Sequence, residues 1–329
     1  KAGRMGLQVF SAFEYEFFIF NETPLSARNK NYRNLEPFTP GNFGYSMLRS
    51  SVHADLYKEL LTLSEKMDFP IESLHTETGP GVLEAAIGVD GAQEAADKAA
   101  LFKTFTKVWA QRQGLMATFM SKWSNDYPGQ SGHIHMSLRH KNDASSAFHD
   151  PQQAMNMSKL QRHFLAGQQK LMPELLVMMA QTVNAYSRLV PGFWAPTDAT
   201  WGCENRTTAL RVIPGTDKSQ RIEFRLGSAD ANPYIALAAC LGAGLYGIEH
   251  ELEPDPMVVG NAYEQRHPAN QMLPRNIIDA ASALYGSVVA RELFGNEFVE
   301  HYAATREWEG REFNKHITDW ELQRYFEII

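Results

Sequence analysis

One strand-like stretch alternates acidic residues with aromatic ones. In SAFEYEFFIF (residues 11–20), Glu14 and Glu16 are two positions apart, so in a strand both side chains point to the same face. Neighbouring carboxylates repel each other, and a buried charge without a partner costs free energy. Either this face is the water-exposed side of an edge strand, or the two carboxylates hold a cation between them. These ten residues alone favour the water-exposed strand.

Other residue types that bind metals also fall in strand-like stretches. They are Glu77 and Glu84 in HTETGPGVLE, His133 and His135 in GHIHMS, and Glu223 in RIEFR. Each has an ordinary structural interpretation, as a solvated hairpin position, a surface or core histidine, or part of a cross-strand ion-pair ladder. Taken together, they form a mostly oxygen-donor set that suits Mg²⁺ or Mn²⁺ better than a structural zinc site.

A set of arginines accompanies these carboxylates: Arg188, Arg206, Arg211, Arg221 and Arg225. Metal-binding carboxylates combined with several arginines are typical of proteins that act on a phosphate-bearing substrate. The sequence has no Walker A pattern. Nucleotide binding would therefore need a fold other than the one that carries this motif.

Strand and helix patterns alternate along the whole chain, which predicts an α+β domain whose sheet curls around the site. Strands are predicted within residues 11–20, on both sides of the glycine turn in 69–88, and at 116–120, 132–140, 207–214 and 220–227. Helices are predicted at 54–67, 91–115, 152–183, 232–252, 274–292 and 294–304, and a long loop at 21–47. No flexible linker divides the chain, so we expect one domain over residues 1–329.

Composition excludes several classes of protein. The 329 residues are 44% hydrophobic and carry a net charge of −7, so a global basic footprint for nucleic acid is absent. No apolar run approaches the roughly 20 residues of a membrane helix. With only two cysteines and no signal-peptide pattern, a disulfide framework is not expected. We therefore expect a cytoplasmic protein with neither a nucleic-acid nor a membrane partner.

The chain resembles the glutamine synthetase family in seven motifs that occur in the family's order and spacing. They are E-x-E, H-x-E-x(6)-E, H-x-H-x-S-L, N-x-Y-x-R-L-V-P-G, N-R-x-x-x-x-R, R-I-E-F-R and A-N-P-Y. The resemblance covers the catalytic domain from about residue 8 to the end. It implies a curved, mainly antiparallel sheet flanked by helices. The family's small N-terminal β-grasp domain has no counterpart in this sequence, which is expected either to be a fragment or to lack that domain.

The resemblance also implies roles for individual residues. Glu16, Glu77 and Glu84 match a first metal site beside the glutamate substrate, and Glu14, His133 and Glu223 match a second site beside the ATP phosphates. The remaining matches are Arg188, His135 and Gly129 for glutamate, Arg206 and Arg225 for the transferred phosphate, and Ser137, Arg211, Lys218 and Arg221 for ATP.

By the same resemblance, the γ-carboxylate of glutamate attacks the γ-phosphorus of ATP to form an acyl phosphate. An amine then displaces phosphate. The implied cofactor is Mg²⁺ or Mn²⁺, and the partners are glutamate, ATP and a small amine. The family also implies a homo-oligomeric ring, a dodecamer.

Two positions depart from the family pattern. The family's glutamate after R-L-V-P-G, which closes the site and helps deprotonate ammonium, is Trp194 here, and an Asn-Gly in the glutamate-binding loop is Pro128-Gly129. An indole cannot accept that proton, although its π face can contact an organic cation. We therefore expect an organic amine, such as an alkylamine or a polyamine, to be favoured over ammonium. Trp194 as a neutral packing change, ordinary glutamine synthesis and a non-catalytic relative stay open as alternatives.

Overall fold

Strand β1 (Leu7–Phe20) lies inside the sheet and separates the core from the predicted site. In the computed structural model, which describes residues 1–328, Phe13, Tyr15 and Phe17 are at most 2% exposed. Glu14 and Glu16 point to the opposite face and are only partly buried. The predicted division of faces is confirmed. The edge-strand interpretation is wrong, because β1 has neighbouring strands on both sides.

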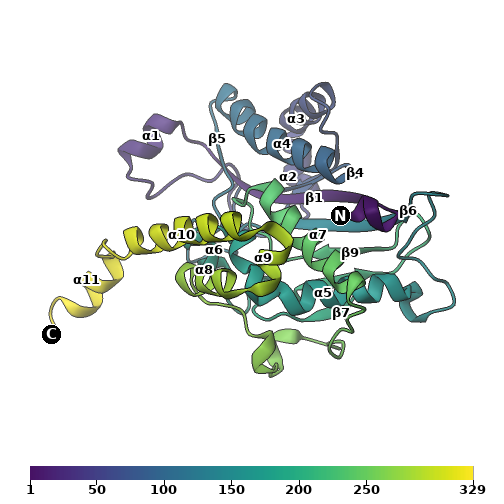
Figure 1. The fold of residues 1–329 in the computed structure, drawn as a ribbon. Helices are drawn as coiled ribbons and strands as arrows, with labels where there is room; N and C mark the ends of the chain where they lie inside the picture. Colours follow the sequence, from purple (N-terminus) through teal and green to yellow (C-terminus); the bar gives the residue numbers. More distant parts are fainter. Residues whose placement is uncertain (329) are drawn as a thin grey trace.

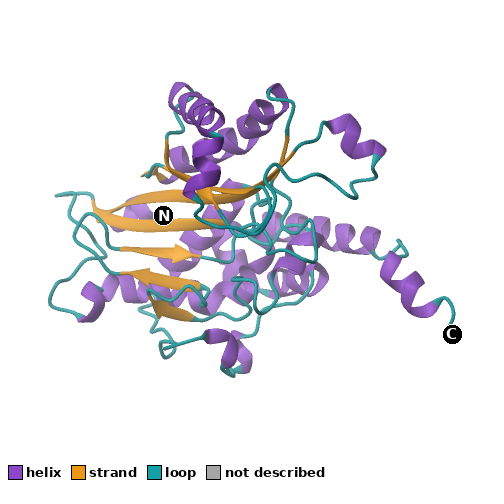
Figure 2. Cartoon of the chain, turned by 180° about the vertical axis from the view of Figure 1, so that it is seen from behind, coloured by secondary structure: helices purple, strands orange, loops and turns teal. Residues whose placement is uncertain are grey.

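Within residues 1–328, nine strands form one open sheet in which seven follow the order β2-β3-β1-β6-β9-β8-β7. Every pair is antiparallel except β7 with β8, which confirms a mainly antiparallel sheet. Figure 2 shows helices packed behind one face, while loops cross much of the other. Besides β1, the strands are β2 (Ile71–Thr76), β3 (Val82–Ile87), β4 (Asp90–Gly91), β5 (Met116–Thr118), β6 (Gly132–His140), β7 (Trp201–Cys203), β8 (Leu210–Ile213) and β9 (Arg221–Phe224).

Long helices cover the apolar face of the sheet (Figure 1). They are α3 (Ala54–Lys66), α4 (Ala92–Arg112), α5 (Lys159–Leu175) and α7 (Pro233–Glu249). Helices α5 and α7 approach so closely that a Cβ on Gly167 would lie 2.1 Å from the carbonyl oxygen of Ala243. Glycine is required there because any side chain would force the two backbones apart. This packing leaves the Glu14 and Glu16 face of the sheet free for the site.

The loop predicted at 21–47 is wrong in part, because it contains a helix, α1 (Pro24–Asn29). Thr23 and Ser26 form a capping box at its start, and Pro24 occupies the first helical position. Both features favour helix initiation in a segment that is otherwise rich in turn residues. A second short helix, α2 (Met47–Val52), begins where the predicted loop ends.

The helix predicted at 152–183 is also wrong in its bounds. Ser158 caps α5, which ends at Leu175 just after Pro173, and Thr182 then caps a separate helix, α6 (Val183–Arg188). The short 3₁₀ turns are Ala2–Met5, Ala154–Asn156, Leu176–Met178, Ala262–Glu264 and Ala269–Gln271. The apolar pattern continues through these breaks, so capping residues rather than periodicity mark the true ends.

The C-terminal helices differ from prediction in the same way. The pair predicted at 274–292 and 294–304 is three helices, α8 (Ile277–Gly286), α9 (Val288–Phe294) and α10 (Asn296–Phe313). Ser287 caps α9, and Gly295, with φ of 84°, separates α9 from α10. Helix α11 (Asp319–Tyr325) ends an arm that extends from the body (Figure 1). In the part of the chain described, no helix has the length and apolar character needed to cross a membrane.

Candidate active site

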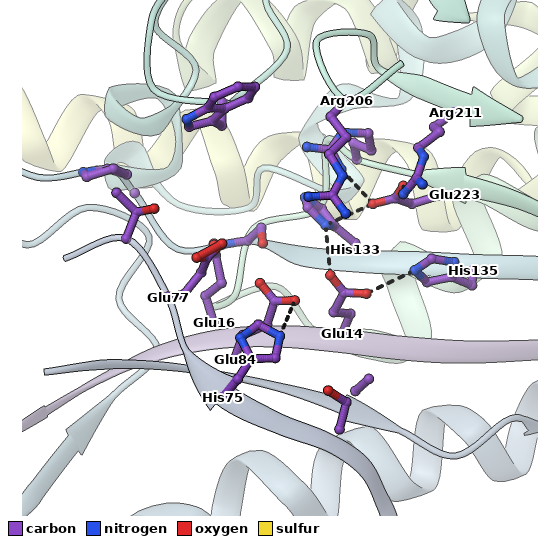
Figure 3. A pocket seen from close by; sticks show the side chains of 18 of the residues that line it. Glu14, Glu16, His75, Glu77, Glu84, His133, His135, Arg206, Arg211 and Glu223 are labelled. Atoms are coloured by element: carbon purple, nitrogen blue, oxygen red, sulfur yellow. Dashed lines mark hydrogen bonds and ion pairs between the residues drawn. The ribbon is translucent and has the colours of Figure 1, made fainter. Parts of the chain in front are cut away.

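A cavity of about 510 Å³ opens on the polar face of the sheet (Figure 3). Most of the predicted site residues line it: Glu14, Glu16, Glu77, Glu84, Gly129, His133, His135, Arg188, Trp194, Arg206, Arg211, Arg221, Glu223 and Arg225. Ser137 and Lys218 are not among the lining residues. Ser137 lies two positions beyond His135 on β6, and Lys218 is exposed in the loop after β8. Their predicted contacts with ATP stay predictions.

The first carboxylate group is formed by Glu16, Glu77 and Glu84, whose ligand oxygens lie within 4.8 Å of one another. Glu16 of β1 is directly opposite Glu84 of β3, and Glu77 follows β2. Burial, and then the charge of Glu14, raise the pKa of Glu84, while burial and the charge of Glu16 raise the pKa of Glu77. Ionisation of all three carboxyl groups is therefore unfavourable unless a cation offsets their charge.

The second group joins Glu14 and Glu223 to two histidines. His133 Nδ1 lies 3.7 Å from Glu14 Oε1 and 3.2 Å from Glu223 Oε1. His135 Nε2 lies 3.2 Å from the other carboxylate oxygen of Glu14. The predicted trio of Glu14, His133 and Glu223 is thus together, and His135, predicted to bind glutamate, joins it in this structure.

The carboxyl groups of this second group are held in their ionised form. Burial opposes ionisation of Glu14, but bonds to His133 and His135 outweigh it and lower the pKa of Glu14 well below its usual range. Burial likewise opposes ionisation of Glu223, yet the bond from His133 and the charge of Arg225 lower its pKa. Ionised carboxylates in this position are suitable metal ligands.

The donor atoms of both groups fit divalent cations. Within the described residues, Nε2 of His133 and Oε2 of Glu77 are buried and have no hydrogen-bond partner. Buried polar atoms are nearly always satisfied, so these atoms indicate a missing partner. Because the donors are mostly carboxylate oxygens with one or two imidazoles, the cation that fits is Mg²⁺ or Mn²⁺.

Two arginines hold Glu223, one on the paired strand β8 and one directly after β9. Arg211 Nη1 donates to Oε2 of Glu223 at 3.1 Å, and Arg225 Nη1 donates to Oε1 at 2.6 Å. Arg225 is 6% exposed, and its Nε has no partner among the described residues. Arg221 Nε lies 3.3 Å from His135 Nδ1, and Arg206 is exposed at the cavity wall. The arginines therefore border the second carboxylate group, where they can meet an anion.

Arg188 is buried beside Gly129 on another wall of the cavity. Its two terminal nitrogens donate to the carbonyl oxygens of Arg225 and Leu226, each at 3.2 Å. A Cβ on Gly129 would lie 2.6 Å from Arg188 Cγ and 2.6 Å from the carbonyl oxygen of Ser121. Gly129 therefore permits the close approach that places the Arg188 guanidinium.

Trp194 lies in the turn after α6 with its backbone in the left-handed region, at φ of 59°. Its indole is 58% exposed and lines the cavity together with Phe193. Lys122 anchors the turn, because its Nζ lies 4.1 Å from the centre of the Phe193 ring and donates to the carbonyl oxygen of Tyr127 at 2.5 Å. A fixed Phe193 and an exposed Trp194 thus form an aromatic part of the cavity wall.

Three aromatic residues that line the cavity, Tyr45, His75 and Phe193, were given no role from the sequence. The Tyr45 hydroxyl donates to Glu77 Oε1 at 3.1 Å, and its ring stacks on His75 with centroids 4.8 Å apart. His75 Nε2 in turn lies 3.5 Å from Glu84 Oε1. His75 could have been given a role, because it is the histidine of the H-x-E-x(6)-E motif and precedes Glu77 by two positions. Tyr45 had no such signal, since it lies in a segment read as loop.

Comparison with known proteins identifies the family to which the cavity residues belong. The family described as "Glutamine synthetase, catalytic domain" matches residues 1–325. The chain is 46% identical over 318 residues to "Type-1 glutamine synthetase 2" of Dictyostelium discoideum, covering 96% of this chain and 61% of that protein. It is 36% identical over 329 residues to "Glutamate--isopropylamine ligase" of Pseudomonas sp, covering 100% of this chain and 72% of that protein.

A solved structure has the same fold. The structure titled "GmaS/ADP complex-Conformation 1" superimposes with a TM-score of 0.88 at 27% identity, covering 99% of this chain and 74% of that one. The chain thus spans between three fifths and three quarters of the length of the proteins compared. Since the family match extends over nearly every residue, this chain belongs to the glutamine synthetase family.

Proposed function

We propose that this chain carries the active site of an ATP-dependent ligase that joins the γ-carboxylate of glutamate to an amine. The observation that carries the proposal is one cavity lined by two carboxylate groups, several arginines and an indole. Membership of the family supports the reaction type, and the matching glutamate–isopropylamine ligase supports an organic amine as acceptor.

The γ-carboxylate of glutamate is a poor electrophile and must be activated before an amine can attack it. In the proposed reaction, one of its oxygens attacks the γ-phosphorus of ATP, giving γ-glutamyl phosphate and ADP. A neutral amine then forms the C–N bond as phosphate leaves. Arg206 and Arg225 border the transferring phosphoryl group and stabilise its charge. Divalent cations bound by the two carboxylate groups would offset the charge of the phosphates and of glutamate.

Arg188 is the proposed anchor for the α-carboxylate of glutamate. A guanidinium can bind a carboxylate with two parallel N–H groups. Arg188 uses one N–H on each of two backbone carbonyl oxygens, which fixes the guanidinium and leaves other donors for the substrate. Gly129 acts through Arg188, because it shapes the space for the arginine's aliphatic stem.

Gly129→Ala should therefore raise KM for glutamate about tenfold and change kcat much less, because the added methyl group displaces Arg188 by a fraction of an ångström. Steady-state kinetics with glutamate varied at saturating ATP checks this. Gly286→Ala is the matched control, since a Cβ on Gly286 has nothing within 4 Å. An unchanged KM in Gly129→Ala would contradict the role given to Arg188.

Trp194 supports an organic amine as the second substrate. The indole contributes apolar area to the cavity wall where the family has a carboxylate, and it is exposed enough to meet an incoming molecule. Burying each CH₂ of an amine contributes about 0.8 kcal/mol, so two buried methylenes shift preference roughly tenfold. Ammonium gains almost nothing from the apolar area of this wall, whereas a protonated alkylamine can bury its methylenes there and also rest on the indole face.

Ordinary glutamine synthesis from ammonium is the second candidate. The protein with 46% identity is named a type-1 glutamine synthetase, which favours this reading. The two candidate reactions differ in the acceptor: kcat/KM for an organic amine depends on apolar area at Trp194, whereas kcat/KM for ammonium does not. They share the glutamate and ATP half of the reaction.

The test is phosphate release from ATP by the full-length protein with glutamate, Mg²⁺ and a panel of primary amines beside ammonium. We expect release to require glutamate, and some organic amine to give a higher kcat/KM than ammonium. Trp194→Glu should lower the ratio of kcat/KM for that amine to kcat/KM for ammonium about tenfold or more. Trp308→Glu is the matched control, because Trp308 is 57% exposed on α10 and does not line the cavity. Equal effects of the two substitutions would show that Trp194 does not determine the preference for an organic amine.

A further inference from the structure

We propose that Glu204 is a positioning residue that holds Arg211 for the phosphates of the nucleotide. This inference rests on the proposed function, in which Arg211 contacts ATP. The family resemblance implies no role for Glu204, and this residue does not line the cavity. It acts on the site only through its contact with Arg211.

Two carboxylates bind the Arg211 guanidinium from opposite sides. One oxygen of Glu204, Oε2, accepts from Arg211 Nε at 2.9 Å and also from Nη2. On the other side, Nη1 donates to Glu223 Oε2 at 3.1 Å. Glu204 directly follows β7, which runs parallel to the Arg211 strand β8, and its backbone N–H donates to the carbonyl oxygen of Val212 at 3.0 Å. The two residues are therefore fixed relative to each other by the sheet.

The donor count leaves Arg211 able to bind an anion. A guanidinium has five N–H groups in a planar fork, and the contacts with Glu204 and Glu223 use three of them. The two remaining N–H groups lie on the terminal nitrogens. Because the two carboxylates fix the plane of the guanidinium, they also fix the directions of these free N–H groups. Without Glu204, one hydrogen bond to Glu223 would be left, and the side chain could rotate about it. Glu204 thus contributes orientation rather than a direct contact with the nucleotide.

The backbone conformation at Glu204 is unusual and is fixed by contacts of the surrounding turn. Glu204 has φ of 50°, in the left-handed region that residues with a side chain rarely adopt. The next residue locks the turn, because Asn205 Nδ2 donates to the carbonyl oxygen of Gly260 at 2.8 Å and its Oδ1 accepts from Thr207 N at 3.0 Å. Such strained conformations persist where surrounding contacts over-determine them, and they cluster at functional sites.

The experiment compares Glu204→Ala, Glu204→Gln and Glu251→Ala in the full-length protein. Glu251 is the matched control, because it also has a positive φ, of 48°, and pairs with Lys159 at 3.3 Å on the exposed surface. We expect Glu204→Ala to weaken ADP binding by calorimetry and to raise KM for ATP, each about tenfold, while kcat changes less than about threefold. Glu204→Gln should restore most of the affinity, since a single oxygen accepts both Arg211 bonds.

Glu251→Ala should leave ADP affinity and KM for ATP unchanged, although both alanine variants alter backbone strain. If Glu204→Ala binds ADP as tightly as wild type, or if Glu204→Gln binds as weakly as Glu204→Ala, positioning through this contact is wrong. ADP affinity tests the role of Glu204, and phosphate release tests the proposed function, so the two can fail independently. A wild-type protein that binds ADP but releases no phosphate with any amine contradicts the ligase, while ADP affinity still decides the role of Glu204.

Discussion

Glu84→Gln lowers kcat at least about a hundredfold and leaves the metal-free protein at least as stable as wild type. The loss of activity is expected because removing even an indirect partner of a metal ligand costs 10- to 100-fold, and Glu84 is a proposed direct ligand. The stability is expected because burial and the charges of its neighbours raise the pKa of Glu84. The isosteric amide resembles the neutral carboxyl group that this environment favours without a cation, and it fills the same space.

Phosphate release and thermal unfolding, each with and without Mg²⁺, measure both parts of this result. Mg²⁺ should raise the melting temperature of wild type and raise that of Glu84→Gln much less. Glu72→Gln is the control, because Glu72 is an exposed residue of β2, the neighbouring strand. Activity in Glu84→Gln above about a tenth of wild type would show that the first carboxylate group does not bind a catalytic cation.

Arg225→Lys lowers kcat about a hundredfold with little change in KM for glutamate. Arg225 is buried, donates to Glu223 at 2.6 Å and keeps a buried Nε without a partner among the described residues. A donor aimed at charge that develops as the phosphoryl group moves contributes mainly in the transition state, and loss of one such donor costs 10²- to 10³-fold. Lysine keeps the charge, yet it cannot hold Glu223 and donate through a second, fixed N–H.

Steady-state kinetics of Arg225→Lys, with ATP and glutamate varied in turn, separates kcat from the two KM values. Arg139→Lys is the control, because Arg139 lies on β6 and binds Asp217 outside the cavity. If the Arg225 substitution raised KM and left kcat intact, Arg225 would bind the ground state rather than act during phosphoryl transfer.

The sequence predicted the faces of the strands better than their partners. The spacing of Glu14 and Glu16 correctly placed both carboxylates on one face, because side chains alternate along any strand. That Glu16 lies opposite Glu84, and Glu14 opposite His133, depends on cross-strand register. Register comes from long-range pairing, which a period of two cannot supply. Grouping the carboxylates by metal site therefore depended on the family resemblance.

Residues outside the repeating patterns were missed for a physical reason. Tyr45 and Glu204 reach Glu77 and Arg211 from irregular segments, whose paths depend on single turns rather than on periodicity. The breaks within the segments predicted as helices at 152–183 and 274–292 were missed although their signals were present. Thr182 and Ser287 are capping residues, but the apolar pattern around them reads as a continuous helix. Caps deserve more weight than periodicity where long helices meet.

One competition experiment decides whether the acceptor is an organic amine or ammonium. The full-length protein receives ATP, Mg²⁺ and glutamate with ammonium and one primary alkylamine at equal concentrations, and mass spectrometry follows both products. The ratio of γ-glutamylalkylamide to glutamine equals the ratio of kcat/KM for the two acceptors. We expect the alkylamide to exceed glutamine for some amine in a panel, and Trp194→Glu to lower this ratio. Glutamine in excess against every amine tested would contradict this expectation.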